Sequence, residues 1–433
     1  MILKPLTQVA EIVLKALSTQ TKLHKPFVKF FTDAVILYLT ITDKINFLQM
    51  SRYGKFCEST YRQNFKKSVD WLKFNISLLP DKIENHLSAI ALDPSYINKS
   101  GKKTPGIGSF WSGCAGAVKK GLEILGFAYV DVDLNEGFFL KAEQTFKGKK
   151  FKGKIPEYLK GLKKCDSLIA WYLRMIEKNS TQLKSISNII VADAYFSKET
   201  FMNGLNIIGF DLISRFRDDV RLKYLYTGKQ HSGRGRRRKY DGSVEIDNLR
   251  EDIFTKETVY DRGEDIVIHS ATAWAVSLKR EVKVVIADYL NPNKKTQTRK
   301  IYFSSNLELK ASDILKLYRA RFKIEFVFRD AKEFTGLTHC QSRIEKSLDF
   351  AFNMSGTAVN IAKKWAKDNG MDISVGSVKC ILKNAAMIER IISMFGKSPN
   401  MKINSTDFKE LLLLGVRSSL KGQNLGDISR PTP

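Results

Sequence analysis

The 433-residue chain is predicted to be a multi-domain α/β protein, with a mixed-sheet core between helical segments at its two ends. Its length exceeds that of one ordinary domain, and its 43% hydrophobic and 11% aromatic residues are enough to build sizeable buried cores. Short apolar runs typical of buried strands begin after residue 86 and continue to about residue 304. Before and after this stretch, apolar residues recur at the three- and four-residue spacing of helices.

The net charge is the first indication of function. The chain has 72 lysines and arginines against 45 aspartates and glutamates, a formal charge of +27. A surplus of this size most often marks a partner with dense negative charge, above all nucleic acid. Charge alone leaves open an unspecialised basic surface and association with a ribosome or a membrane.

The cysteine pattern excludes two kinds of scaffold. Five cysteines occur without a CxxC pair and without histidines at zinc-finger spacing, which argues against a disulfide framework and structural zinc and fits a reducing cytosol. The most apolar early window, residues 34–48, is interrupted by Thr40, Asp43 and Lys44. We therefore expect no signal peptide, no membrane association and a cytoplasmic location.

Residues 1–85 are expected to form a helical N-terminal DNA-binding domain. Residues 43–50 and 58–71 have helical patterns, and Gly54 lies in the turn between them. The second segment carries Arg62 and two further basic residues, as a helix-turn-helix reader would. An ordinary helix pair without a role in DNA recognition explains the pattern equally well.

Two aspartates follow short apolar runs. Residues 89–92 are predicted to form a buried strand that ends at Asp93, and residues 189–192 a second one that ends at Asp193. The carboxyl ends of strands are where sites form in α/β folds, although aspartate is also common there as a turn or cap residue.

Between and after these strands the pattern predicts further elements. Strands are expected over 127–133 and 136–144, and a helix over 156–177; Ser197 is expected to cap the helix that follows Asp193. The region from 205 is strand-rich, with strands over 207–216, 222–226, 265–270, 274–289 and 300–304. Within it, residues 233–239 (GRGRRRK) are too basic and glycine-rich for a core and are expected to form a mobile loop.

A helix is predicted over residues 312–334, with Ser312 as its N-terminal cap and Gly336 at its end. Its surface carries Tyr318, Arg321, Glu325 and Lys332 at offsets 0, 3, 7 and 14, with Arg329 on the same side. At about 100° per residue, the first four project within an arc of roughly 60°. A solvated face with ion pairs from Arg321 to Glu325 and from Glu325 to Arg329 would show the same spacing.

Taken together, Asp93, Asp193 and Glu325 supply three carboxylates to a sheet and a packed helix. Converging carboxylates repel one another unless a cation lies between them. Oxygen ligands of this type suit Mg²⁺ or Mn²⁺ and do not suit zinc.

The motif Tyr-x2-Arg-x3-Glu-x6-Lys, from Tyr318 to Lys332, matches the YREK signature of a large family of bacterial insertion-sequence transposases of the DDE class. The segments LDPSY around Asp93 and ADAYFS around Asp193 resemble the two aspartate motifs of that family, and the resemblance covers roughly residues 80–345. It implies a ribonuclease-H-like mixed-sheet core with a β-rich insertion between the second aspartate and the glutamate.

This resemblance gives the expected domain layout. A helical N-terminal domain (1–85) precedes the first part of the core (86–204), a β-rich insertion (205–299), the second part of the core with the YREK helix (300–342), and a helical C-terminal region (343–433). Residues 422–433 are expected to be a frayed tail.

The resemblance also implies roles. Asp93, Asp193 and Glu325 would hold two Mg²⁺ ions, which Mn²⁺ could replace, while Tyr318, Arg321 and Lys332 would contact phosphates of the transposon ends. The implied partners are double-stranded DNA, both the terminal inverted repeats and the target, and a second copy of the chain in the DNA complex, at the bacterial nucleoid. Arg329 and Arg62, and the basic runs at 99–103 and 147–154, are further candidate DNA contacts, although those runs fit solvated loops as well.

One feature departs from the family pattern. Some members carry a tryptophan just before the last core strand that stacks on a flipped base, and residues 293–300 contain none; Trp274 or Tyr302 could replace it. The sequence leaves two other functions open. One is a ribonuclease-H-like nuclease or resolvase without strand transfer, and the other is an inert DNA-binding descendant of a transposase. We expect Asp131 and Asp133 to face solvent, the five histidines to form no metal site, and, without a P-loop motif, no use of ATP.

Overall fold

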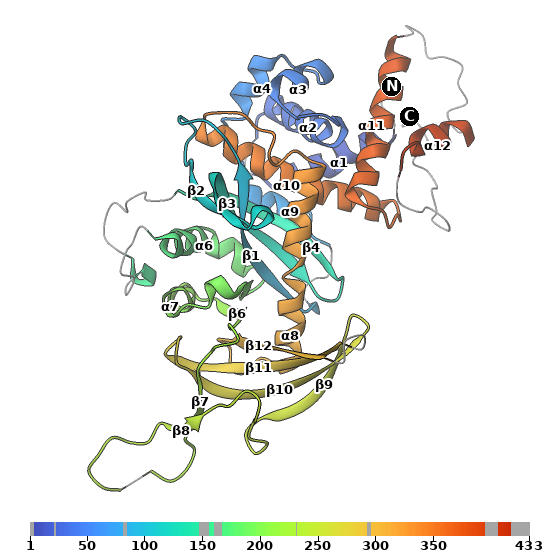
Figure 1. The fold of residues 1–433 in the computed structure, drawn as a ribbon. Helices are drawn as coiled ribbons and strands as arrows, with labels where there is room; N and C mark the ends of the chain where they lie inside the picture. The colour runs from blue at the N-terminus through green and yellow to red at the C-terminus, as the bar shows by residue number, and fades with distance from the viewer. Residues whose placement is uncertain are drawn as a thin grey trace.

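The computed structural model describes residues 4–20, 23–80, 85–146, 156–159, 167–230, 232–291, 296–394 and 406–416. Helices from both ends of the chain lie together at the top of the view in Figure 1, the sheet with its flanking helices lies below them, and a strand-rich lobe lies at the bottom. No helix within the described ranges is both long and apolar enough to span a membrane. The predicted tail at 422–433 and the basic run at 147–154 fall outside the described residues.

One twisted sheet links the core and the lobe. The strands follow the order β2-β3-β1-β5-β6-β12-β11-β10-β7-β8, with β4 beside β3 and β9 beside β10. Their bounds are β1 Ser88–Asn98, β2 Gly108–Ser112, β3 Ala117–Asp131, β4 Glu136–Gln144, β5 Ile189–Ala192, β6 Asp211–Arg215, β7 Leu222–Leu225, β8 Tyr240–Ser243, β9 Thr255–Asp261, β10 Glu264–Ala275, β11 Arg280–Asn291 and β12 Thr296–Ser304.

The core half of this sheet is mixed. Strand β1 is antiparallel to β3 and β3 to β4, whereas β1, β5 and β6 run parallel to one another. The spatial order β4-β3-β1-β5-β6, with α6 (Leu168–Lys184) and α7 (Glu199–Ile208) in the connections, is compatible with a ribonuclease-H-like core. The strand predicted over 127–133 corresponds to the last third of the longer β3, which ends at Asp131, and β4 has the predicted bounds.

Two helix starts in the core differ from the prediction. The helix expected from residue 156 begins at Leu168, because the Ser167 hydroxyl accepts a hydrogen bond from Ala170 N–H and caps it there. Ser197 does not cap α7, whose N-terminal cap is Lys198. The Ser197 hydroxyl instead donates to the carbonyl of Arg215 at 2.8 Å, so it ties the loop after Asp193 to β6.

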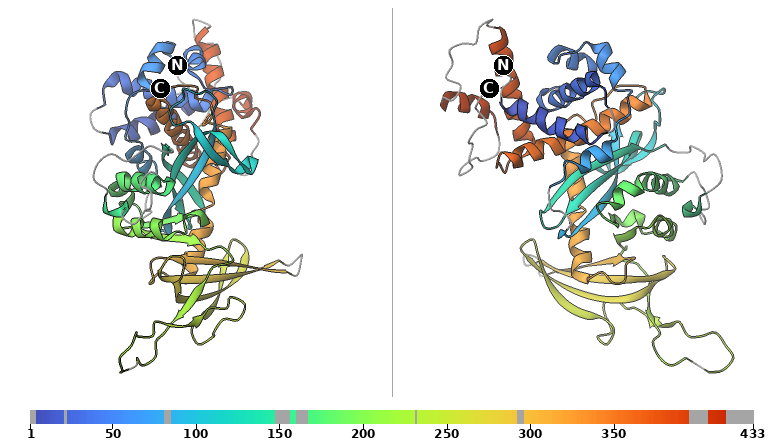
Figure 2. Two further views of the ribbon diagram at one scale, coloured as in Figure 1. Left: turned by 60° about the vertical axis from the view of Figure 1, so that its left-hand side comes forward. Right: turned by 180° about the vertical axis from the view of Figure 1, so that it is seen from behind.

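The strand-rich region contains two elements that the sequence pattern merged. The strand expected over 207–216 is the end of α7 followed by β6, because Gly209 adopts a left-handed conformation and ends the helix. The strand expected over 274–289 is a hairpin of β10 and β11. Strand β12 pairs with both β11 and β6, so the lobe continues the core sheet. In both views of Figure 2 the lobe lies beneath the core.

The helix predicted over 312–334 is two helices, α8 (Ala311–Ala320) and α9 (Lys323–Glu333). At the break, the amides of Ile324 and Glu325 bond three residues back, to the carbonyls of Arg321 and Phe322, in the tighter 3₁₀ pattern. The predicted cap at Ser312 is wrong, because α8 starts after Lys310. Gly336 lies in the left-handed region just past the end of α9, as expected.

Two glycines allow α9 to lie close to the sheet. A Cβ at Gly126 would lie 2.2 Å from Cζ of Phe328, and a Cβ at Gly137 would lie 2.7 Å from Cβ of Lys323. Because Gly126 is the residue that pairs with Asp93 across β1 and β3, the α9 helix is seated directly over Asp93. The α8 helix, which precedes α9, packs against β6 of the core and against β12 and β11, which lead into the lobe.

The remaining helices form one body. Helices α1 (Lys4–Ser18) and α2 (Lys25–Thr40) pack against α10 (Glu345–Asp368) and α11 (Val375–Met394). Phe350 of α10 lies among aromatic rings of the N-terminal segment, namely Phe30, Phe31, Phe65 and Trp71. The helix expected over 43–50 is α3 (Phe47–Tyr53), which begins four residues later than predicted. The helix expected over 58–71 is shorter than predicted: α4 (Glu58–Asn64) ends at Asn64, and a separate α5 (Trp71–Ile76) starts after its cap, Asp70. The short α12 is Thr406–Leu413.

We predict that Gly126→Ala lowers the free energy of unfolding by about 1–3 kcal/mol, because the new methyl group overpacks against Phe328. Chemical denaturation measures this difference. The matched control is Gly113→Ala, where an added Cβ meets no atom within 4 Å. Equal stability of the two variants would show that α9 does not depend on the close approach at Gly126.

Candidate active site

Asp93 and Asp193 occupy equivalent places on neighbouring parallel strands. The pairing of β1 with β5 ends at Leu92 and Ala192, which lie opposite each other. Asp93 directly follows Leu92, and Asp193 directly follows Ala192. The sequence prediction is correct for Asp193, which follows β5 and accepts a hydrogen bond from Tyr195 N–H. Asp93 does not end its strand, because β1 continues along β3 to Asn98.

Both aspartates belong to the face of the sheet that α9 covers. Side chains alternate along a strand, and Ala91 and Val191, two residues before the aspartates, lie in the core cluster that contains Val327 and Phe328 of α9. The intervening Leu92 and Ala192 lie in the cluster beneath α6 and α7. The side chains at 93 and 193 therefore continue the row that faces α9.

The guanidinium of Arg321 lies between two of the predicted carboxylates. Its Nη1 is 4.0 Å from Oδ1 of Asp93, and its Nη2 is 3.0 Å from Oε1 of Glu325. Only 7% of the Arg321 side chain is exposed, and its buried Nε has no partner among the described residues. Arg321 therefore does not lie on a solvated helix face, the alternative that the spacing left open: it lies at the break between α8 and α9 and reaches inward to the acids.

Burial shifts the pKa values of the two aspartates. It raises the pKa of the Asp93 carboxyl to about 7; Arg321 opposes this rise, and the Asp193 and Glu325 carboxylates add to it. The pKa of Asp193 is also raised by burial, against the opposing effect of Arg321. One guanidinium thus compensates the acids only in part. Three oxygen donors that are short of positive charge fit Mg²⁺ or Mn²⁺.

The remaining YREK residues differ in how near they lie to the acids. The Tyr318 ring lies 4.8 Å from that of Tyr302 and 5.7 Å from the Arg321 guanidinium. Burial lowers the pKa of Lys332, while Cys114 and Asp93 act in the opposite direction, which places this ammonium within electrostatic reach of Asp93. Arg329 is exposed and bonds to Asp330, so the pair between Glu325 and Arg329, named above only for the alternative of a solvated helix face, does not form.

The predicted DNA contacts outside α9 lie apart from these carboxylates. Arg62 is paired with Glu58 on the two-turn helix α4 and lies over the Phe47 ring. In the basic run at 99–103, Lys99 donates to the carbonyl of Cys340. Of the aromatic replacements for the missing tryptophan, Tyr302 is buried beside Tyr318. Trp274 packs on Tyr240, in the lobe.

A second group of residues that could bind a metal lies beside the N-terminal end of β1. Ligand atoms of His86, Asp131 and Asp133 lie within 4.8 Å of one another, and within the described ranges no other trio of such residues meets this distance. Asp131 is fully buried and bonds to Nδ1 of His86, so the expectation that it faces solvent is wrong; Asp133 is exposed as expected. Residue spacing gave no signal for this cluster, because 45 residues separate the histidine from its partner.

The protein itself uses the oxygens of this cluster. Asp131 accepts from Leu134 N–H and Asp133 from Leu87 N–H, which closes the end of the sheet. By the pairing register, Asp131 lies five residues along β3 from the residue opposite Asp93, or about 17 Å. We regard the cluster as a structural network.

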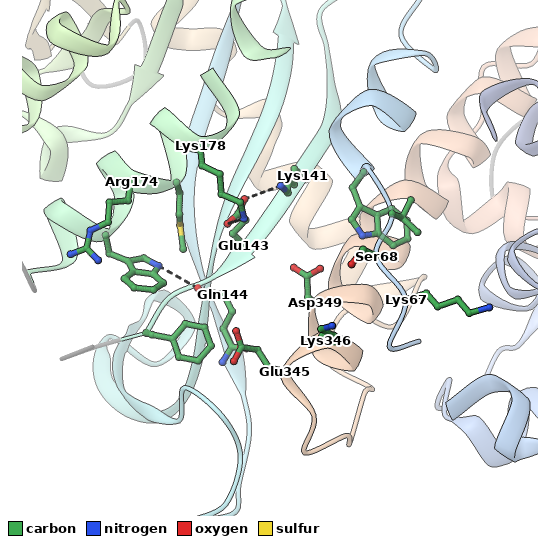
Figure 3. Close-up of a pocket in the computed structure, with 15 residues that line it drawn as sticks. Lys67, Ser68, Lys141, Glu143, Gln144, Arg174, Lys178, Glu345, Lys346 and Asp349 are labelled. Atoms are coloured by element: carbon green, nitrogen blue, oxygen red, sulfur yellow. Dashed lines mark hydrogen bonds and ion pairs between the residues drawn. The ribbon is translucent and has the colours of Figure 1, made fainter. Parts of the chain in front are cut away.

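A cavity of about 520 Å³ lies between β4, α6 and the start of α10 (Figure 3). None of the three predicted carboxylates lines it. On its wall Glu143 pairs with Lys141 and Lys178, and the pKa of Glu143 is lowered because these two lysines outweigh its burial. The nearby Asp349 carboxyl faces the cavity without a lysine in contact, and burial raises its pKa to about 6.

One protein-family model matches a central segment of the chain. Residues 170–361 match the family described as the transposase DDE domain. The matched segment includes Asp193 and Glu325, whereas Asp93 precedes it. It spans somewhat less than half of the chain and supports a DDE transposase. DNA is the partner that this match implies. A comparison with curated proteins found no match.

The raised pKa of Asp349 predicts a pH-dependent stability. Because its pKa in the folded protein lies above the ordinary value near 4, the carboxyl stabilises the fold at low pH, and this contribution is lost as the pH rises through about 6. Asp349→Asn should therefore melt about 1–3 °C above the wild type at pH 8 and at the same temperature at pH 4.5. The exposed Asp43→Asn is the control, with no such difference expected. A lower melting temperature for Asp349→Asn at pH 8 would contradict the prediction.

Proposed function

We propose that the protein is a DNA transposase of the YREK type, which binds the terminal inverted repeats of its element and cuts and rejoins DNA with divalent metal ions. The observation that carries the proposal is the placement of Asp93 and Asp193 on adjacent parallel strands, with Arg321 between Asp93 and Glu325. The family match over residues 170–361 supports the same class.

In the proposed mechanism, Asp93, Asp193 and Glu325 hold two Mg²⁺ ions, which Mn²⁺ could replace. When bound, the ions supply Lewis-acid activation of the attacking water or 3′-hydroxyl and stabilise the leaving oxygen. Arg321, whose guanidinium lies between Asp93 and Glu325, would pair with a phosphate in the fork geometry of a guanidinium. Lys332 would act on the same backbone as a point charge, and the Tyr318 ring, 5.7 Å from the Arg321 guanidinium, would support that guanidinium by a cation–π contact.

The surface charge supports duplex DNA as the substrate. The chain carries a net charge of +27, and the basic Arg329, Arg62 and residues 99–103 would hold the backbone without reading its sequence. Joining two ends requires two active sites on one DNA complex, so we propose a homodimer in that complex. A nuclease or resolvase of the same fold would also use the three acids and would cut the ends without joining them.

We expect Asp93→Asn, Asp193→Asn and Glu325→Gln each to reduce strand cleavage by roughly 1,000-fold or more while end binding persists. The substrate is a duplex carrying the inverted repeats that flank the reading frame, and strand transfer is read from joined products on a gel. Glu333→Gln, exposed on the same helix, is the matched control and should cleave normally.

Normal cleavage by any of the three variants would remove that residue from the site. Cleavage without joined products would favour the nuclease or resolvase. Absence of metal-dependent cleavage in the wild type would favour an inert DNA-binding descendant.

Lys332→Ala should weaken binding to transposon ends and reduce the slope of log affinity against log salt by about one phosphate contact. A mobility-shift series across salt concentrations measures the slope. Lys367→Ala, an exposed lysine on α10, is the charge-matched control. An unchanged slope for Lys332→Ala would indicate that Lys332 makes no phosphate contact and belongs to a solvated helix face.

A further inference from the structure

The basic segment singled out in the sequence projects from the lobe as an arm. It connects β7 to β8 and reaches away from the rest of the molecule at the lower left of Figure 1. At its base, Tyr226 N–H donates to the carbonyl of Lys239 at 3.0 Å. The Gln230 amide bonds both to the N–H and to the carbonyl of Arg238. The arm thus has a braced base.

The arginines of the arm divide into one that is engaged and three that are not. Arg238 lies over the Tyr226 ring at 4.6 Å and pairs with Asp241, so it belongs to the base. Arg234, Arg236 and Arg237 are exposed, and none has a hydrogen bond or ion pair to another residue that the structure describes. No acidic residue occurs between positions 229 and 240 to neutralise them.

The choice of arginine over lysine is not explained by solubility. The chain has 51 lysines and 21 arginines, yet residues 233–239 contain four arginines and one lysine. A loop that only needed positive charge would follow the lysine-rich composition of the chain. Arginine is favoured where a narrow minor groove concentrates negative potential, because the guanidinium is weakly hydrated and enters the groove more readily than an ammonium.

The glycines make the arm thin enough to enter such a groove. The minor groove of B-DNA is about 6 Å wide, which excludes a helix or a strand pair with large side chains. Gly235 has a φ of 152°, a conformation that favours glycine, and a Cβ there would meet no atom within 4 Å. The Arg234-Gly235-Arg236 unit therefore presents a bare backbone between two long cationic side chains.

We propose that residues 233–239 form a minor-groove arm that inserts Arg234 and Arg236 into A·T-rich duplex DNA. This inference rests on the proposed function, in that DNA is the partner. Because β12 joins the lobe to the core sheet, DNA held at the carboxylates and DNA held by the arm are engaged by one continuous scaffold. The arm thereby adds a preference for base composition at a distance from the cleaved bond.

The test compares binding of the full-length protein to two duplexes of equal length, one A·T-rich and one G·C-rich, both without the inverted repeats. Fluorescence anisotropy gives the two dissociation constants. The wild type should prefer the A·T-rich duplex by about tenfold. The triple variant R234A/R236A/R237A should lose the preference and bind both duplexes more weakly. The charge-matched R234K/R236K/R237K should lose most of the preference while retaining most of the non-specific affinity.

The outcomes separate this proposal from the transposase proposal. Three results would each refute the proposal of a minor-groove arm. They are a wild type without A·T preference, a lysine variant that keeps the full preference, and tighter binding to single-stranded RNA than to the duplex. Displacement by a small minor-groove ligand such as netropsin would support it. Cleavage of transposon ends is read separately: D93N should bind the A·T-rich duplex like the wild type, so loss of cleavage and loss of the preference are independent results.

Discussion

The ring of Phe328 lies on Gly126, and Gly126 is the residue opposite Asp93 in the neighbouring strand. This contact fixes how closely α9 approaches the sheet. Glu325 lies about one turn before Phe328, so the same contact brings its carboxylate to the face of the sheet that carries Asp93. The preceding helix α8 packs against β11 and β12. The position of α9 on the sheet therefore also influences where the lobe lies.

The electrostatics of the site follow from that geometry. Burial raises the pKa values of Asp93 and Asp193, and the Arg321 guanidinium offsets only part of the effect. Replacing or supplementing this guanidinium with divalent cations would relieve the repulsion and leave Arg321 able to pair with DNA phosphate. In the proposed function, the high positive charge of the whole chain would act at longer range by attracting the DNA backbone.

Much of the candidate site could be predicted because local patterns carry it. Apolar runs located the strands before Asp93 and Asp193, and fixed spacing picked out the helix with Glu325. The break at Arg321 could not be predicted, because helical periodicity continues through it. The turn between β10 and β11 was missed because residues 276–279 (VSLK) contain no glycine, proline, asparagine or aspartate, and Lys279 adopts a positive φ of 51°.

The proposed mechanism requires that Asp93, Asp193 and Glu325 form a divalent-metal site. Electron paramagnetic resonance with Mn²⁺ as the probe measures it directly, as the free-ion signal lost on titration into the protein without DNA. The wild type and a His86→Ala variant should bind Mn²⁺ equally, and Asp93→Asn should not bind it. Binding that is lost in His86→Ala and retained in Asp93→Asn would place the metal at the His86 cluster and contradict the account.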